Sequence, residues 1–355
     1  MNLLSGDPPQ GLPLRILIGL IVAGLALAPF LFPGAKPIDV AAKICVMILL
    51  VASYDLLIGY AGIVSFAHVM FFGIGAYGIG LSLSGLGPEW SSVAIGLAAG
   101  SAVSLILALA IGLFSLRVQA IFFAMVTLAV AYAFNVLASQ LSGFTGGEDG
   151  RSFKVPPGLQ PSFRLLKTPV FGAHVNGKLL TYYLVFGVVA LAFLVLLRIV
   201  NSPFGRVLQA IRENPFRSEA LGYRIVVHRT LATAISALGA TLAGALSAIW
   251  LRYVGPDTAL SFSIQVDVLV MVVVGGMGSL YGAIIGATLF ILAESYLRDL
   301  IGALSIAAAD AHLPILPAIF HPDRWLLWLG LAFVLAVYFA PTGIVGALKR
   351  NRSAA

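Results

Sequence analysis

The sequence predicts an all-α polytopic membrane protein that crosses the bilayer with about 8 to 10 helices. Of its 355 residues, 60% are hydrophobic and only 10% are charged, and the mean hydropathy is +1.03. Soluble domains carry about 25% charged residues, so a soluble fold of this composition would lack the polar surface that faces water. Apolar runs of about 20 residues, the length that crosses the hydrocarbon core, recur along the whole chain.

Ten segments have the length and composition of a membrane span. The first resembles a signal peptide that ends at Ala26-Leu27-Ala28, but Pro29 disfavours cleavage, so a first transmembrane helix is favoured. The second and third segments are separated only by a Gly-rich elbow, as are the eighth and ninth. Each pair is either two crossings or one broken, re-entrant element. The ten segments cover roughly residues 14–33, 38–58, 63–83, 93–115, 118–140, 181–200, 231–251, 264–281, 283–298 and 325–341.

Three connections are long. Residues 142–179 contain four prolines and the sequence TGGEDG, and are predicted to form an external loop. Residues 201–230 are polar. Pro at the first position suits a helix over 203–213, Asn214-Pro215 ends that helix, and a second short helix over 216–221 is predicted. This segment is either an ordinary basic loop or a docking element for a cytosolic partner. The third stretch, 299–324, is expected to lie along the membrane surface.

Charge alone does not orient the chain. The net charge is +7 and the pI is about 9.6, which in a soluble protein would suggest a nucleic-acid partner. In a membrane protein, basic residues instead flank the spans as topology signals. With ten spans, the side that holds both termini and residues 201–230 carries 11 of the 21 Lys and Arg residues, and the opposite side carries 10. The positive-inside rule is therefore nearly tied.

Two Gly-rich segments interrupt apolar runs, at 59–62 and at 275–282. Interrupted spans in corresponding places of two internal repeats indicate a substrate site between them. Backbone groups freed at membrane depth must face protein or water. Close packing of small residues is the structural alternative. The residues predicted near a translocation path are Asp55, Gly59, Gly62, Ser65, His68, Gly275, Gly276, Gly278, Ser279 and Gly282.

Five ionisable residues lie within the predicted spans: Lys43, Asp55, His68, Asp267 and Glu294. Each would cost about 2.5–3.5 kcal/mol if it faced lipid at the bilayer centre, so these side chains are expected to face the protein interior. Asp55 and His68 flank the first break, and they either line a polar path or make structural hydrogen bonds. Asp267 and Glu294 fall near span ends, where a charged residue is a weaker indication of function.

The sequence holds no recognisable catalytic or metal-binding set. Residues 73–78 match the dinucleotide fingerprint GxGxxG, but they lie inside an apolar helix, without the strand that this site requires. No GxxxxGK[ST] or HExxH motif occurs, the histidines are scattered, and Cys45 is the single cysteine. No catalytic residue, metal site or ATP-binding site is therefore predicted on this chain.

Four segments resemble the LivM-type permeases of branched-chain amino-acid ABC importers. They are GYAGIVSFAHVMFFGIGAY, TGGEDG, AIRENPFRSEALGY and GGMGSLYGAIIGA, in the family's order within residues 40–345. The resemblance implies four partners: a homologous permease, two cytosolic ATP-binding subunits and a periplasmic substrate-binding protein. ATP and Mg²⁺ would be held by the partner subunits. The family usually has an amide residue where Asp55 stands, a departure that bears on the substrate.

The resemblance also implies residue roles. Residues 201–230 resemble a cytoplasmic coupling helix that inserts into an ATPase groove. Short amphipathic helices present apolar anchors to such grooves, and Ile211, Phe216 and Leu221 are expected in that role. The full set expected to couple to the ATPase is Ile211, Arg212, Glu213, Asn214, Phe216, Arg217, Glu219, Ala220, Leu221 and Gly222. The external-loop residues expected to help receive the binding protein are Thr145, Gly146, Gly147, Asp149 and Gly150.

The function that the resemblance implies is that of an importer subunit without covalent chemistry of its own. Residues 1–355 would form one permease domain in the bacterial inner membrane, with both termini cytoplasmic and a branched-chain or related small amino acid as the solute. Related permeases for urea, amides or aromatic acids are alternatives. An ion-coupled secondary transporter is a further alternative, which Asp55 and the broken helices would suit. A membrane-embedded enzyme is disfavoured because its motifs are missing.

Overall fold

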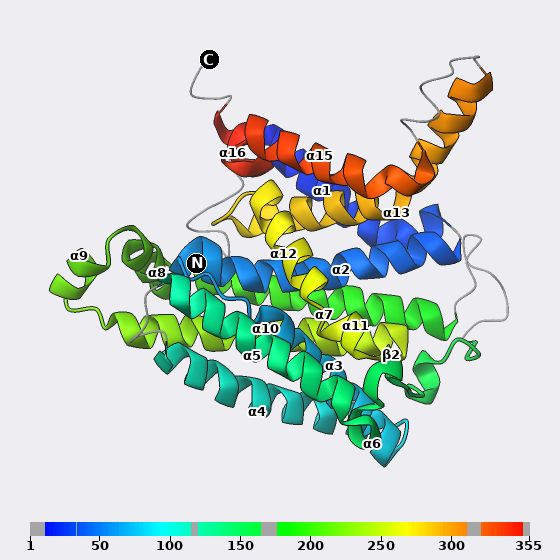
Figure 1. The fold of residues 1–355 in the computed structure, drawn as a ribbon, viewed down its shortest axis with the longest axis horizontal. Helices are drawn as coiled ribbons and strands as arrows, with labels where there is room; N and C mark the ends of the chain where they lie inside the picture. Colours follow the sequence, from blue (N-terminus) through cyan, green and yellow to red (C-terminus); the bar gives the residue numbers. More distant parts are fainter. Residues whose placement is uncertain (1–10, 33, 115–119, 165–175, 311–320, 351–355) are drawn as a thin grey trace.

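The computed structural model describes residues 11–32, 34–114, 120–164, 176–310 and 321–350. They are almost entirely helical (Figure 1). The long helices are α1 (Leu12–Leu31), α2 (Ala35–Asp55), α3 (His68–Leu86), α4 (Trp90–Phe114), α5 (Ala120–Gln140), α7 (Gly177–Val200), α10 (Ile225–Leu251), α12 (Phe262–Gly275), α13 (Leu280–Asp310) and α15 (Trp325–Phe339).

Shorter elements connect these helices. The α-helical ones are α6 (Ser142–Thr145), α8 (Pro203–Glu213), α9 (Pro215–Ala220), α11 (Pro256–Ala259) and α16 (Gly343–Arg350). A π-helical segment, η1 (Leu56–Ala61), continues α2, and single 3₁₀ turns are η2 (Gly147–Asp149), η3 (Pro157–Leu159) and η4 (Pro322–Arg324). Strands β1 (Arg151–Ser152) and β2 (Tyr253–Val254) pair antiparallel.

Ten helices of the described chain are long and apolar enough to cross a membrane, which confirms the predicted fold class. Each of the ten predicted segments overlaps one of them. In the stretch 299–324, the described residues up to Asp310 continue α13, whose last part turns away from the bundle (Figure 1), and the expectation that this stretch lies along the membrane surface stays a prediction. Residues 280–310 contain no proline, and Ala and Leu, which favour helix, are frequent in them. Residues 311–320 of that stretch lie outside the described part.

Successive spans run in alternating directions. At one end, which holds α8 and α9, Leu14 of α1 packs with Val345 of α16, and Gly112 of α4 lies against Thr230 of α10. At the opposite end, Gly80 of α3 packs against Val254 (Figure 1). Each Gly-broken pair therefore consists of two crossings. The first and last described helices begin and end, respectively, at the α8–α9 end.

Helix α2 is the centre of the bundle and is covered by its neighbours along nearly its whole length. By contrast, α1, α4, α5 and α15 have few buried residues, and large apolar side chains are exposed on each of them. In a membrane, such faces meet lipid or another subunit. Glycine packs the centre closely: Gly75 of α3 lies against the backbone of Thr241, and Gly244 of α10 lies against that of Phe72. Close packing of small residues, the alternative to a role in transport, thus describes Gly75 of α3.

Candidate functional site

The first break lies between α2 and α3. Helix α2 widens into η1, and Gly62 then takes a left-handed conformation with φ 68°, which ends the helix. The backbone stays unwound until α3 begins at His68. Other helices satisfy two N–H groups here: Phe66, in the unwound segment, donates to Thr127 Oγ1 at 3.0 Å, and Val69, in the first turn of α3, donates to Gln265 Oε1 at 3.1 Å. Such partners are what an unwound segment requires at membrane depth.

The second break lies between α12 and α13. Helix α12 ends at Gly275, and the next four residues turn the chain back into α13. Within this turn Gly276 has φ 116° and Gly278 has φ 82°, conformations that side chains with a Cβ rarely adopt. Gly282 N donates to Ser279 O at 2.7 Å and so begins the new helix. The buried Ser279 hydroxyl has no hydrogen-bond partner in the part of the chain that the structure describes.

The two breaks meet at Asp55. The Gly278 backbone N–H donates to Asp55 Oδ1 at 2.8 Å, although the two residues are 223 positions apart in the chain. Asp55 is 1% exposed, and among the described residues its second carboxylate oxygen meets no hydrogen-bond partner within normal geometry. Gly59 leaves the space for this contact, because a Cβ there would collide with both the Asp55 carboxylate and Gly278 N.

Helix α8 reaches the same point through Arg212. Its Nη1 donates to the Gly59 carbonyl oxygen. The stem of Arg212 lies over Gly62, where an added Cβ would come within 2.8 Å of Arg212 Cγ. The guanidinium also interacts electrostatically with the Asp55 carboxylate. We call this group (Asp55, Gly59, Arg212 and Gly278) the junction, since it joins α8 to both breaks.

The sequence folds locally so that Arg212 reaches the junction. Pro203 occupies the first turn of α8, as predicted, and Gly205 lies directly against Val200 O of the preceding helix. Leu208 and Ile211 are fully buried and fix one face of α8 against the bundle. Ile211, predicted as an anchor for a partner, therefore packs within its own chain in this structure.

The outer part of the segment is presented to solvent. Asn214 caps α9 by accepting from Arg217 N at 3.0 Å, and Gly222 follows with φ 90°. Phe216 is 83% exposed and Leu221 is 71% exposed, so two of the three predicted anchors point away from the bundle. The other predicted coupling residues on this surface are also exposed: Glu213, Arg217, Glu219 and Ala220.

The structure places His68 and Ser65 inside the bundle. His68 Nε2 lies 2.9 Å from Ser53 Oγ, and its Nδ1 lies 3.5 Å from Ser236 Oγ. The imidazole thus joins α3 to α2 and α10. The Ser65 hydroxyl accepts from Ala67 N at 3.3 Å, within the unwound segment. These contacts match the structural alternative for His68.

The TGGEDG sequence lies at the end opposite α8 and α9. Thr145 Oγ1 donates to Ala138 O at 2.6 Å and closes the end of α5. Gly146, Gly147 and Gly150 all have positive φ, which folds the loop tightly. The Tyr253 hydroxyl donates to Asp149 O at 2.9 Å, so the loop is fixed to the end of α10.

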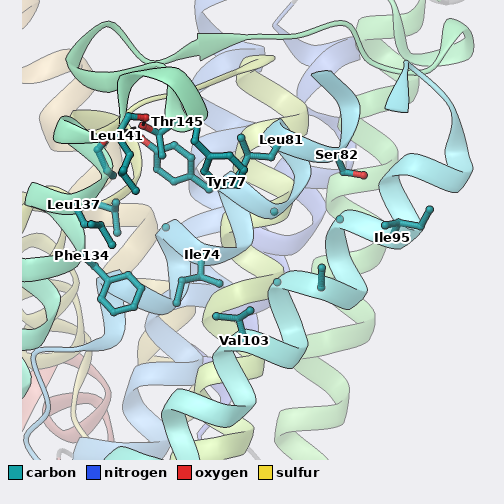
Figure 2. Close-up of a pocket in the computed structure, with 18 of the residues that line it drawn as sticks. Ile74, Tyr77, Leu81, Ser82, Ile95, Val103, Phe134, Leu137, Leu141 and Thr145 are labelled. Atoms are coloured by element: carbon teal, nitrogen blue, oxygen red, sulfur yellow. Dashed lines mark hydrogen bonds between the residues drawn. The ribbon is translucent and has the colours of Figure 1, made fainter. Parts of the chain in front are cut away.

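An apolar groove of about 530 Å³ opens between α3, α4 and α5. Figure 2 shows Ile74, Val103, Phe134 and Leu137 around it, with Tyr77 and Thr145 toward its α6 end. It holds no charged side chain, and its walls belong to helices whose outer faces are apolar and exposed. A groove of this kind suits lipid chains or an apolar helix rather than a charged solute.

A second, larger cavity of about 960 Å³ opens at the end opposite the junction, between α2, α10, α12 and α13. Unlike the apolar groove, it is lined by side chains of both charges. Neither this cavity nor the residues that stabilise the first break, Thr127 and Gln265, were predicted from the sequence, because no local motif marks them.

Comparison with known proteins agrees with this architecture. High-affinity branched-chain amino acid transport system permease protein LivM of Salmonella typhimurium is 27% identical over 297 residues, which is 80% of this chain and 68% of that protein. The protein of the same name from Escherichia coli K12 is 28% identical over 299 residues, with the same coverage. A probable LivM of Methanocaldococcus jannaschii is 28% identical over 186 residues, 51% of each chain.

No solved structure matches the chain. The family model described as branched-chain amino acid transport system / permease component matches residues 36–340, which include both breaks, the junction and the α8–α9 segment. The chain therefore belongs to the family of branched-chain amino acid transport permeases.

Proposed function

We propose that this chain is the membrane-spanning permease subunit of an ATP-driven ABC importer. It translocates branched-chain or related small amino acids that a periplasmic binding protein delivers. Its partners are a homologous permease and two cytosolic ATP-binding subunits, which hold ATP and Mg²⁺. The observation that carries the proposal is the α8–α9 segment, which exposes Phe216 and Leu221 outward and extends Arg212 inward to the junction.

This geometry supports the transmission of motion from the ATPase subunits to the transport path. An ATPase groove holds Phe216 and Leu221, as grooves hold the apolar anchors of short helices. Because Leu208 and Ile211 are packed into the bundle, α8 moves together with the helices beneath it. Closure of the ATPases then displaces Arg212 and, through it, the contact between the two breaks. The permease rocks between two arrangements, and the ligands' differential affinity sets their populations.

The proposal also orients the chain. With α8 and α9 in the cytoplasm, the N-terminal end of α1 and the C-terminal end of α16 lie on the cytoplasmic side of the inner membrane. The loop that contains TGGEDG and the large charged cavity then face the periplasm, where a binding protein releases its solute. The opposite direction would place Phe216 and Leu221 in the periplasm, away from any ATPase.

The docking step is tested by Phe216→Asp. A charge at this exposed position leaves the fold intact but cannot enter an apolar groove, so co-purification of the ATP-binding subunits and ATP-driven uptake of leucine are expected to fall together. The matched control for ATPase retention is Phe144→Asp, an exposed phenylalanine (62%) at the opposite end, which is expected to keep the ATP-binding subunits. Retention of the ATPases by Phe216→Asp, or uptake that follows an ion gradient without them, would overturn the proposal.

A further inference from the structure

We infer that the charged cavity within this single chain is a binding site for a zwitterionic solute, whose carboxylate is held by Arg252. The inference rests on the proposed import function and deepens it, since it names the place where the solute is held and the residue that holds its carboxylate. The cavity's volume of about 960 Å³ falls within the range of small-molecule sites, about 300–1,000 Å³.

Charges of both signs surround the cavity. Its lining includes four basic residues, Lys36, Lys43, Lys178 and Arg252, and four acidic ones, Asp39, Asp257, Asp267 and Glu294. Most of these belong to ion pairs: Lys43 lies 2.8 Å from Glu294, Lys178 lies 2.8 Å from Asp39, and Lys36 lies 2.5 Å from Asp299.

Three charges remain. Within the described part of the chain, the side chains of Arg252, Asp257 and Asp267 make no hydrogen bond or ion pair. Asp267 is partly buried and lies close enough to Glu294 and Lys43 for electrostatic interaction. A solute with one carboxylate and one ammonium group complements a free guanidinium and a free carboxylate, whereas a neutral solute leaves both unpaired.

The backbone at Arg252 gives an independent reason to assign it a role. Arg252 ends α10 in the left-handed conformation (φ 56°, ψ 28°), and it is the one non-glycine residue with positive φ in the described chain. Glycine usually occupies this position after a helix, because a Cβ there is strained. Backbone strain of this kind clusters at functional sites, where the surrounding structure holds it in place. Here that side chain lines the cavity.

The floor of the cavity is apolar. Phe72, Met271 and Ile291 belong to the lining and are almost fully buried, and Trp250 forms part of the wall. A solute whose charged groups bind near Arg252 and Asp267 would extend a branched aliphatic side chain onto this floor. Met47, also in the lining, precedes Asp55 on α2 by eight residues, about 12 Å of helix. The cavity is thus separated from the junction by two packed turns.

A thiol-protection experiment tests this site without ATPase or binding protein. Ser247 is half-buried in the cavity wall, and the native Cys45 is buried, so Ser247→Cys provides a single reactive thiol. The permease pair in nanodiscs is treated with a membrane-impermeant maleimide, with and without L-leucine. Leucine at about ten times its dissociation constant is expected to slow modification about tenfold. Leucinol and 4-methylpentanoate, which each lack one charge, are expected to protect much less.

Two sets of controls separate the site from its surroundings. Ser84→Cys, exposed at the same end but outside the cavity, is expected to react without protection. Arg252→Ala is expected to abolish protection of Cys at 247, whereas Lys154→Ala, an exposed cation of the same end, leaves it unchanged. Arg252→Gly should also lose protection while its thermal midpoint stays equal or rises, because glycine relieves the left-handed strain. A purely structural role for Arg252 predicts a lower midpoint instead.

The outcomes distinguish this inference from the import function. No protection by leucine, full protection in Arg252→Ala, or protection by urea or benzoate in place of leucine would overturn the zwitterion site while ATP-driven leucine uptake still stands. Loss of that uptake from the wild-type assembly, with protection retained, would overturn the import function and leave the site.

Discussion

Replacing Arg212 tests the link between α8 and the membrane breaks. Its guanidinium donates to Gly59 O and acts on the buried Asp55 carboxylate. Arg212→Gln keeps a good helix former but removes the charge and shortens the side chain. A hydrogen bond from a charged donor contributes about 1.5–3 kcal/mol. That loss corresponds to a shift of about 10- to 150-fold in the equilibrium that holds α8 against the breaks.

The assay is leucine uptake per ATP hydrolysed by the full importer in proteoliposomes. For Arg212→Gln this ratio is expected to fall at least about tenfold. ATP hydrolysis continues and the ATPases still co-purify, because Phe216 and Leu221 are untouched. The matched control is Arg206→Gln, an exposed arginine earlier on α8, for which the ratio is expected to stay at the wild-type value.

Two results would refute this reasoning. Equal ratios for Arg212→Gln and Arg206→Gln would show that the junction does not transmit the motion of α8. Loss of the ATPase subunits from Arg212→Gln would show that Arg212 acts in docking, in spite of its inward contact with Gly59.

Three further changes probe the site. Gly59→Ala drives a Cβ into the Asp55 carboxylate and Gly278 N, so its thermal midpoint in detergent should fall well below that of Gly222→Ala. At Gly222 the space is open, and only the left-handed backbone strain applies. Equal midpoints would contradict the close contact at Gly59. Gln265→Leu leaves the buried Val69 N–H unpaired at a cost of about 1–3 kcal/mol, so its midpoint in the same melting assay should fall below that of the wild type; an unchanged midpoint would contradict the stabilising role of this hydrogen bond. Asp55→Asn preserves the acceptor for Gly278 N and removes a buried charge, so uptake should stay within about twofold of wild type. Asp55→Leu removes the acceptor and should abolish uptake. Equal loss of uptake in both variants would assign the charge itself a role.

The spans and their breaks were predictable because both depend on local composition. Apolar runs of the right length occur in every one of the ten helices, and the glycines at 59–62 and 275–282 mark the places where the helices end. The helix over 203–213 was likewise predictable from Pro203 and Asn214. In each case the physical cause lies within a few residues of the feature that it determines.

The contacts that join these elements were not predictable in the same way. Asp55 and Gly278 are 223 residues apart, Arg212 and Gly59 are 153 apart, and Lys43 and Glu294 are 251 apart. The ion pair between Lys43 and Glu294 shows that two of the ionisable residues expected within the spans pair with each other. Pairing over such distances depends on how the helices pack, which no local pattern records.

The conformation of Arg252 was the least predictable feature of all. Nothing in the sequence LRYVGP marks an arginine in a left-handed conformation, since the usual signal for such a helix end is glycine. The structure shows its side chain beside a cavity at one end of α2, while Arg212 lies at the other end of the same helix. Because α2 is buried along nearly its whole length, a shift at either end is opposed by all the helices around it. Under the proposed function, a solute at Arg252 and an ATPase acting through Arg212 would therefore bias the same rigid element, and α2 would couple two sites that do not touch.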